Sequence, residues 1–297
     1  MSARLRFQAP PRASASAEIL ARPPLSDWRE YAALLQDGAW PDCAALEAWR
    51  RQAITRDGIA RPVFAPQTVE LLADGLHYEQ RIADRGIVAT REGNWHDLFN
   101  ALVWLRHPHL KLALNARQVA DIAEVGPKTR TRGQCAMTQF DEAGAIVWCA
   151  DPELIALWDA HDWPGLFLRE RALWRRRIAV TVFGHALLER QFLGGDALST
   201  AKTIAVQVEA EEIASRCTGE DSTIAHWDQA EARIAMAIRD GELLTDPQQP
   251  RPLPLVGIPG WHADGALPAF YRDAPCFRPL RHGRSYPPPF VPGAPAH

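Results

Sequence analysis

The stretch from Asn94 to Trp104 constrains the fold of this chain more than any other part of its sequence. Its apolar side chains recur at the i, i+3, i+4, i+7 and i+8 spacing of a helix with one buried face; they are Trp95, Leu98, Phe99, Leu102 and Val103. Asn94 precedes this run as a capping residue, and Asp97 stands at the third helical position, where a carboxylate can bond back to the cap. The spacing therefore predicts a buried helix that begins after Asn94.

His96 and Asn100 lie four residues apart beside the apolar stripe, so they share a face of the same helix. A histidine beside a carboxylate can act as a general base, and the two can also bind a metal, which makes His96 and Asp97 candidate catalytic residues. The alternative is that Asp97 only caps the helix and His96 only bonds a neighbour. Under that alternative, the three-residue spacing from Asn94 explains the presence of Asp97 by its capping role alone.

A second polar group follows on the helix expected over 108–124. Lys111, Asn115 and Arg117 lie one or two turns apart, so they can bind a phosphate or carboxylate, with lysine as a point charge and arginine as a fork. The alternative is an ordinary solvated helix surface.

His185 and Glu189 form a third candidate pair, four residues apart on a short helix that follows a predicted strand. This spacing lets both face one ligand or metal, although a local His–Glu hydrogen bond is the simpler alternative. Lys202 ends a Ser-x-x-Lys sequence that begins at Ser199. A strand is predicted from Thr203, so Ser199 does not begin a helix as it does in serine acyl-enzymes, and Lys202 remains only a candidate ligand contact.

One further set of residues has a spacing similar to that of HNH nucleases, in which a ββα unit holds a divalent metal. This set is His77, Asn100 and His109. Asn100 is predicted to lie in the middle of a helix rather than in the connecting loop, which argues against this alternative. We keep it as a remote one.

Composition narrows the class of protein. The net charge of −3 gives no reason to expect nucleic acid or an anionic membrane as a partner, and a basic stretch at 169–177 contains an acidic residue of its own. No run of about 18 apolar residues predicts a transmembrane helix. The five cysteines are scattered and lack C-x-x-C pairs, as is typical of free thiols in a reducing cytoplasm. We therefore expect a cytoplasmic protein; its oligomeric state cannot be read from these residues.

Periodicity and turn signals predict the other elements. Helices are expected over 26–36, 42–53, 108–124, 184–193 and 222–239, with a short helix after 151. Strands are expected over 77–82, 87–90, 134–140, 145–149, 175–183 and 203–208, the first two and the next two as hairpins. These elements predict an α+β fold, a predominantly helical single domain with a small antiparallel sheet. Residues 1–24 are expected to form a flexible arm, 25–246 the domain, and the proline-rich 247–297 an irregular wrap on its surface.

Several stretches resemble a proteobacterial domain-of-unknown-function family, number 3025 of that series. They are Trp95–Trp104 (WHDLFNALVW), Tyr78–Ile82, Phe183–Glu189 (FGHALLE) and Thr200–Thr203 (TAKT), together with Lys111 and Leu114–Ala116. The resemblance covers roughly residues 25 to 275 and implies one domain. It implies no activity, so it assigns no catalytic residue.

Two hypotheses follow. In the first, the chain is a metal-assisted hydrolase that acts on an anionic or phosphate-containing substrate; a divalent metal of unknown identity is its cofactor. His96, Asp97, His185 and Glu189 then carry the chemistry, and Asn100, Lys111, Asn115, Arg117 and Lys202 hold the ligand. In the second, it is a non-catalytic binding or scaffold protein whose polar side chains satisfy buried groups. The enzyme requires His96 and His185 to lie within about 10 Å, close enough to share a ligand.

Overall fold

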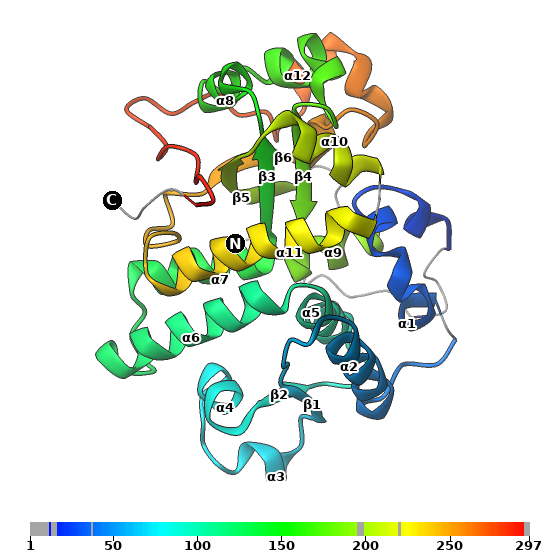
Figure 1. The fold of residues 1–297 in the computed structure, drawn as a ribbon, viewed down its shortest axis with the longest axis vertical. Coiled ribbons are helices and arrows are strands. Elements are labelled where there is room, and N and C mark those ends of the chain that lie inside the picture. The colour runs from blue at the N-terminus through cyan, green and yellow to red at the C-terminus, as the bar shows by residue number, and fades with distance from the viewer. Residues whose placement is uncertain (1–11, 13–16, 37, 195–198, 219–220, 294–297) are drawn as a thin grey trace, which may run out of the picture.

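A computed structural model describes residues 12, 17–36, 38–194, 199–218 and 221–293 (Figure 1). Most of the arm predicted for residues 1–24 lies outside these ranges. The described chain is mainly helical with two small sheets, so the predicted α+β class with dominant helices is confirmed. Among the described residues, none of the helices combines the length and apolar character that crossing a bilayer requires.

The larger sheet has four strands in the order β4-β3-β5-β6. They are β3 (Gly144–Cys149), β4 (Ile178–Val182), β5 (Thr200–Gln207) and β6 (Arg251–Pro254). β3 pairs antiparallel with β4 but parallel with β5, and β5 pairs antiparallel with β6. The prediction of a purely antiparallel sheet is therefore wrong. The proline-rich C-terminal region, expected to be irregular, contributes β6 to the edge of this sheet.

The smaller sheet consists of β1 (Val63–Pro66) and β2 (Ile87–Thr90) in parallel register. Parallel strands need a long crossover connection, and here it contains the short helix α3 (Val69–Leu72) and α4 (Tyr78–Arg85). The strand predicted over 77–82 is thus wrong. The His77 side chain accepts a hydrogen bond from the backbone of Glu79 and forms a capping box with Gln80, which begins the helix instead.

The strand predicted over 134–140 is also wrong, because α7 (Arg132–Ala143) occupies this region. Thr131 begins the helix with a capping box: its hydroxyl accepts from the backbone N–H of Gln134, whose side chain accepts from the backbone N–H of Thr131, each at 2.9 Å. As a result the expected hairpin turn at 141–144 is the last turn of a helix that leads directly into β3.

The other predicted helices are present. The buried helix is α5 (Trp95–Arg106), with the Asn94 side chain accepting from the backbone of Asp97 at 3.0 Å. Its apolar stripe is 0 to 3% exposed and forms the centre of the core, as its periodicity predicts. α6 (Pro108–Val125) lies alongside α7 and α11 (Asp221–Arg239), as Figure 1 shows. The remaining α-helices are α1 (Ala32–Gln36), α2 (Cys43–Asp57), α8 (Pro152–Asp159), α9 (His185–Phe192), α10 (Ala210–Thr218) and α12 (Pro268–Asp273).

The beginnings of β3 and α9 approach each other at two glycines. The backbone N–H of Gly184 donates to the Gly144 carbonyl at 2.8 Å. A Cβ on Gly184 would lie 2.4 Å from the Gly144 nitrogen, closer than side chains are found. The missing side chain lets α9 begin directly beside the last turn of α7.

We predict that Gly184→Ala lowers the free energy of unfolding by about 1–3 kcal/mol, because the added methyl group must displace backbone atoms. Urea unfolding measures this change. Gly38→Ala is the matched control, because a Cβ there meets nothing within 4 Å, and its stability should stay within about 0.5 kcal/mol of the parent protein. Equal stability of the two variants would contradict the proposed close approach.

Candidate functional site

Three helix ends meet at one cluster of polar side chains. His96 lies in the first turn of α5, His185 is the first residue of α9, and Glu142 lies in the last turn of α7. His96 Nε2 is 3.1 Å from His185 Nε2, so the two imidazoles point at each other. The predicted convergence of the two histidines is therefore found, at a separation far shorter than the enzyme hypothesis requires.

Glu189 orients one of these rings. Its Oε2 is 3.1 Å from His96 Nδ1, which leaves His96 Nε2 directed at His185. Glu142 completes the cluster: its two carboxylate oxygens lie 3.9 Å from His96 Nε2 and 3.7 Å from His185 Nε2. One atom from each of His96, Glu142 and His185 lies within 4.8 Å of the others, which is close enough for one metal ion.

The cluster is buried on one side and open on the other. The side chain of His185 is 5% exposed, whereas those of His96 and Glu142 are 36% and 43% exposed. The fixed rings therefore form the floor of the site, and Glu142 lies at its solvent side.

The two histidines have different pKa values because their surroundings differ. Burial lowers the pKa of His185 to about 3, against the opposing effect of the Asp141 carboxylate, so this ring is neutral at pH 7. The hydrogen bond that His96 Nδ1 donates to Glu189 raises the pKa of His96 in spite of partial burial. Burial raises the pKa of Glu142. The 3.1 Å contact of the two Nε2 atoms requires a proton on one of them, which it donates to the other.

A buried ion pair supports the cluster from below. Lys111 Nζ donates to Asp141 at 2.6 Å and to Asn100 at 2.9 Å. The second Asp141 oxygen lies 3.8 Å from His185 Nδ1. Burial alone would raise the pKa of Asp141, but the charge of Lys111 and its hydrogen bond to the carboxylate hold that pKa below its usual value. The Asn100 amide donates in turn to the Tyr78 hydroxyl at 2.9 Å.

Asn115 extends the polar network along α6. Its amide donates to the backbone carbonyl of Glu79 and, at 2.7 Å, to the Glu79 carboxylate. Burial raises the pKa of Glu79. Lys111 thus joins Asn100 to Asp141 beside the histidine cluster, whereas the bonds of Asn115 are to Glu79. Each of the three is already bonded to other protein groups.

Three predicted site residues make other contacts. Asp97 does not bond to His96 but forms an ion pair with Arg91 at 2.7 Å. Arg117 pairs with Asp121 on its own helix at 3.2 Å. Lys202 lies on β5 and takes no part in the hydrogen bonds described for the histidine cluster.

The HNH spacing does not produce an HNH site. His77 caps α4, Asn100 bonds Tyr78 and Lys111, and His109 lies on α6. The strands that a ββα unit needs are replaced by α4, since residues 78–85 are helical.

Sequence reasoning missed Asp141 and Glu142. Both fall in the segment expected to be a hairpin turn, where acidic residues are unremarkable. The capping-box spacing from Thr131 to Gln134 was the available signal: a helix that begins there places both carboxylates in its last turn.

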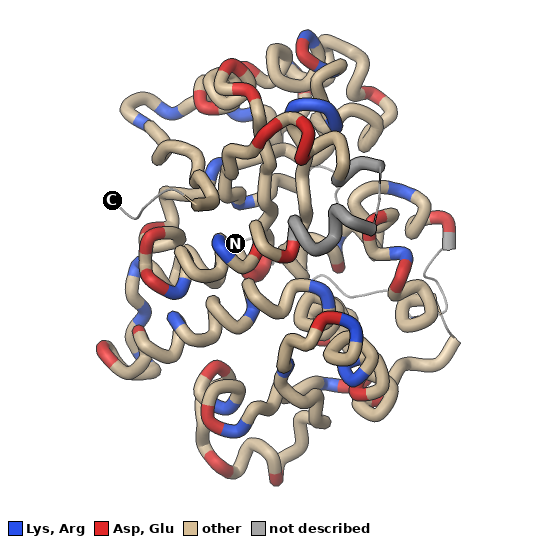
Figure 2. Tube along the Cα trace, in the orientation of Figure 1, with Lys and Arg blue, Asp and Glu red and all other residues tan. Residues whose placement is uncertain are grey.

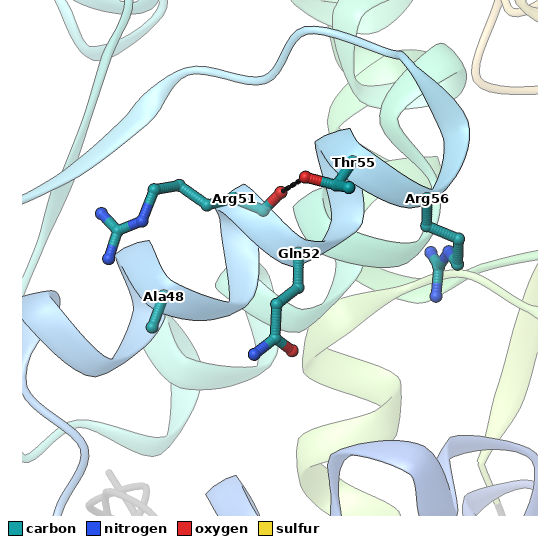
Figure 3. A pocket seen from close by; sticks show the side chains of 5 residues that line it. All are labelled: Ala48, Arg51, Gln52, Thr55 and Arg56. Atoms are coloured by element: carbon teal, nitrogen blue, oxygen red, sulfur yellow. Dashed lines mark hydrogen bonds between the residues drawn. The ribbon is translucent and has the colours of Figure 1, made fainter.

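A shallow surface hollow lies elsewhere, on α2 (Figure 3). Its lining residues are Ala48, Arg51, Gln52, Thr55 and Arg56. Figure 3 shows one hydrogen bond among them, from the Thr55 hydroxyl to the Arg51 carbonyl at 2.9 Å. None of these residues belongs to the histidine cluster, so we assign the hollow no part in the candidate site.

Comparison with known families identifies one family model that matches this chain. The family model described as "Protein of unknown function (DUF3025)" matches residues 63–281, which is most of the chain. The chain belongs to this family. The region matched to DUF3025 contains every residue of the cluster and its supporting network. The family description names no activity, and no significant match was found among curated proteins or solved structures.

The first prediction at this site concerns the ion pair. Asp141→Asn and Lys111→Met should each lower the free energy of unfolding by about 2–4 kcal/mol, because each leaves the other charge buried without its partner. The double variant should lose less than the sum, since neither charge then remains. Urea unfolding of all four proteins gives the coupling. Strict additivity would show that the two side chains do not depend on each other.

The second prediction concerns Glu79. Its raised pKa means that the native state keeps this proton to a higher pH than the unfolded chain does. Stability is therefore lost as pH rises from about 4.5 through the folded pKa. Glu79→Gln keeps an acceptor for Asn115 without the charge. At pH 7 we expect it to be more stable than the parent, and the difference should vanish near pH 4. A variant less stable at pH 7 would contradict this.

Proposed function

We propose that His96, His185 and Glu142 bind one divalent metal ion and that the chain is a metal-assisted hydrolase. The observation that carries this proposal is the 3.1 Å separation of the two Nε2 atoms. Two imidazoles directed at one point, with a carboxylate beside them, form a common donor set of catalytic zinc sites.

The distances fit such an ion. With metal–nitrogen bonds of about 2.0–2.1 Å, two nitrogens 3.1 Å apart subtend an angle of about 100°, between octahedral and tetrahedral values. Glu142 lies slightly too far for this geometry, at 3.7 and 3.9 Å from the two nitrogens. Its exposed side chain is free to turn inward. The metal would replace the proton that the two rings share, so affinity should rise with pH.

The groups around the three ligands support the same assignment. A histidine that binds a metal through Nε2 usually places Nδ1 against a carboxylate or carbonyl, which fixes the ring. Glu189 takes this position for His96 at 3.1 Å, and Asp141 lies on the Nδ1 side of His185 at 3.8 Å. Each of the two histidines thus has an acidic side chain on its Nδ1 side.

The open side of the cluster favours catalysis over a purely structural site. Three protein ligands leave one coordination position free, and it faces solvent here because His96 and Glu142 are partly exposed. A metal held in this way would lower the pKa of water and polarise a carbonyl or phosphoryl oxygen. In this proposal the protein would hold both rings in the neutral, ligand form, with Glu142 as the third ligand and Glu189 holding the His96 ring in place.

The expectation of an anionic substrate is separate from the proposal of a metal site. Lys111 is bonded to Asp141 and Arg117 to Asp121, so the proposal does not use either as an anion clamp. The same donor set also holds iron(II) in oxygenases. The metal present in the purified protein is therefore the first measurement to make.

We predict that the purified protein binds one equivalent of zinc or a related divalent metal, measured by elemental analysis and by titration after chelator treatment. His96→Ala and His185→Ala should abolish stoichiometric binding. Glu189→Gln, which changes only the support of His96, should weaken binding by about 10–100-fold. His109→Ala is the control, because this histidine lies on α6 outside the cluster. Unchanged affinity in both ligand variants would end the proposal.

Turnover then separates a hydrolase from a metal-binding scaffold. The metal-loaded protein is assayed on p-nitrophenyl acetate and p-nitrophenyl phosphate, beside His185→Ala treated identically. Hydrolysis that follows metal content and is absent from the variant supports the enzyme. Full metal binding without hydrolysis of any ester in a broader set supports the scaffold alternative.

A further inference from the structure

Arg12 is a buried cation that takes no part in the histidine cluster. Only 7% of this residue is exposed. Its guanidinium lies 5.1 Å from the ring centre of Trp40 and 5.4 Å from that of Trp95. Its Nη2 donates a hydrogen bond to the Leu34 carbonyl at 2.6 Å. These contacts join Arg12 to α1, to the loop before α2 and to the first residue of α5.

The three groups that Arg12 contacts are suited to a guanidinium. The rings of Trp40 and Trp95 are 4.6 Å apart at an interplanar angle of 60°, so one guanidinium reaches both. Arginine stacks on aromatic faces, and tryptophan gives the strongest contacts of this kind. Leu34 lies in the last turn of α1, where carbonyl oxygens can accept a hydrogen bond from a side chain. We call the two indoles and this carbonyl the indole slot.

An apolar side chain would fill the indole slot at a lower cost than arginine. Burying a guanidinium removes its hydration, and ordering its long side chain costs conformational entropy. Lys and Arg are interspersed with Asp and Glu over the molecule (Figure 2), so no large field of one sign accounts for the position of this cation. The arrangement therefore favours specific recognition of the guanidinium over simple packing.

The indole slot also contacts the elements that carry the histidines. Trp95 immediately precedes His96 in the first turn of α5 and is 3% exposed. Its ring lies 4.9 Å from that of Phe192 on α9, the helix that begins with His185. Trp95 thus contacts both Arg12 and α9. A filled slot therefore restrains the first turn of α5 against the helix that carries the second histidine.

We propose that the indole slot is a guanidinium-binding site that Arg12 fills as an internal ligand, and that its occupancy holds the first turn of α5 where His96 meets His185. Arg12 is then a positioning residue, because it acts on the histidines through Trp95. The guanidinium site depends only on the contacts of Arg12, whereas its effect on metal binding rests on the proposed function.

The first experiment tests the site by chemical rescue in the full chain. Arg12→Ala removes the internal ligand, and the Tm should fall by at least about 4 °C, since a buried cation–π contact and a charged hydrogen bond are lost. N-ethylguanidinium reproduces the end of the missing side chain. At about 20 mM it should raise the Tm of the variant by at least about 2 °C and leave that of the parent unchanged. Propylammonium has the same charge without the planar fork and should give no rise.

Arg106→Ala is the matched control. The Arg106 guanidinium also stacks on an indole, 4.7 Å from the ring centre of Trp28, and also donates to a backbone carbonyl, that of Asp27. Its side chain is 26% exposed, so the space that it leaves is open to water and N-ethylguanidinium should not raise the Tm of this variant. Equal rises in the two alanine variants, or no rise in either, would overturn the guanidinium site.

Arg12→Lys keeps the proposal testable if the alanine variant does not fold. Lysine retains the charge and most of the apolar stem but not the planar fork, so the Tm of this variant should lie below that of the parent. A Tm equal to that of the parent would show that the slot accepts any cation, which contradicts a site for guanidinium.

Zinc titration tests the effect on the histidines. Arg12→Ala should bind zinc about 2–30-fold more weakly than the parent, and N-ethylguanidinium should restore the affinity. Arg106→Ala should bind zinc as the parent does. Unchanged zinc affinity in Arg12→Ala, beside a rescued Tm, would overturn the positioning role alone. If the parent binds no zinc, the proposed function fails and the positioning role with it, whereas the rescue of Tm still decides the guanidinium site.

Discussion

The ion pair between Lys111 and Asp141 determines where the polar groups of this molecule lie. It joins the middle of α6 to the last turn of α7, and α7 leads directly into β3 at the centre of the larger sheet. Lys111 is buried and its ammonium also lies 5.2 Å from the Trp104 ring. A charge in such surroundings is tolerated only with its partner in place. The end of α7, and with it Glu142, is thereby held in one position.

The histidine cluster combines rigid and adjustable parts. His96 and His185 both stand at helix N-termini, where the helix dipole disfavours a protonated ring and so favours the neutral, ligand form. Glu189 opposes this for His96, because its hydrogen bond raises the pKa of that ring. Glu142 is the most exposed of the three candidate ligands. In the proposed function, an ion would reach the two nitrogens from the solvent side, where Glu142 lies.

Local sequence signals predicted the elements that carry the histidines but not their surroundings. The apolar periodicity of α5 and the strand-then-helix pattern before α9 placed His96 and His185 on the correct elements. Their meeting depends on Gly184 lying against Gly144, which is a contact between distant segments that no local pattern contains. The same holds for the parallel pairing of β3 with β5, because alternation of apolar residues is alike for either strand direction.

Capping explains the largest errors. The segments 77–82 and 134–140 contain β-compatible residues, but a capping box at the start of each makes them helical. Histidine is not a common capping residue, so α4 was difficult to predict from the sequence. The threonine and glutamine at the start of α7, Thr131 and Gln134, have the usual capping-box spacing and could have been recognised. Because α7 was predicted as a strand and a turn, Asp141 and Glu142 were not recognised as site residues. At Asp97 the opposite happened: this residue was predicted to belong to the site, but its carboxylate pairs with Arg91.

Charge bears on where an anionic substrate could bind. Around the histidines, Asp141, Glu142 and Glu189 outnumber the single ammonium of Lys111, a balance that favours a cation over an anion. A metal and an anionic ligand were expected at one site. Of the cations expected to hold that ligand, Lys111 pairs with Asp141, Arg117 pairs with Asp121, and Lys202 lies on β5. Under the proposed function, an anionic substrate at the histidines would therefore have to be held by the metal itself, because the cations of the same network already have partners.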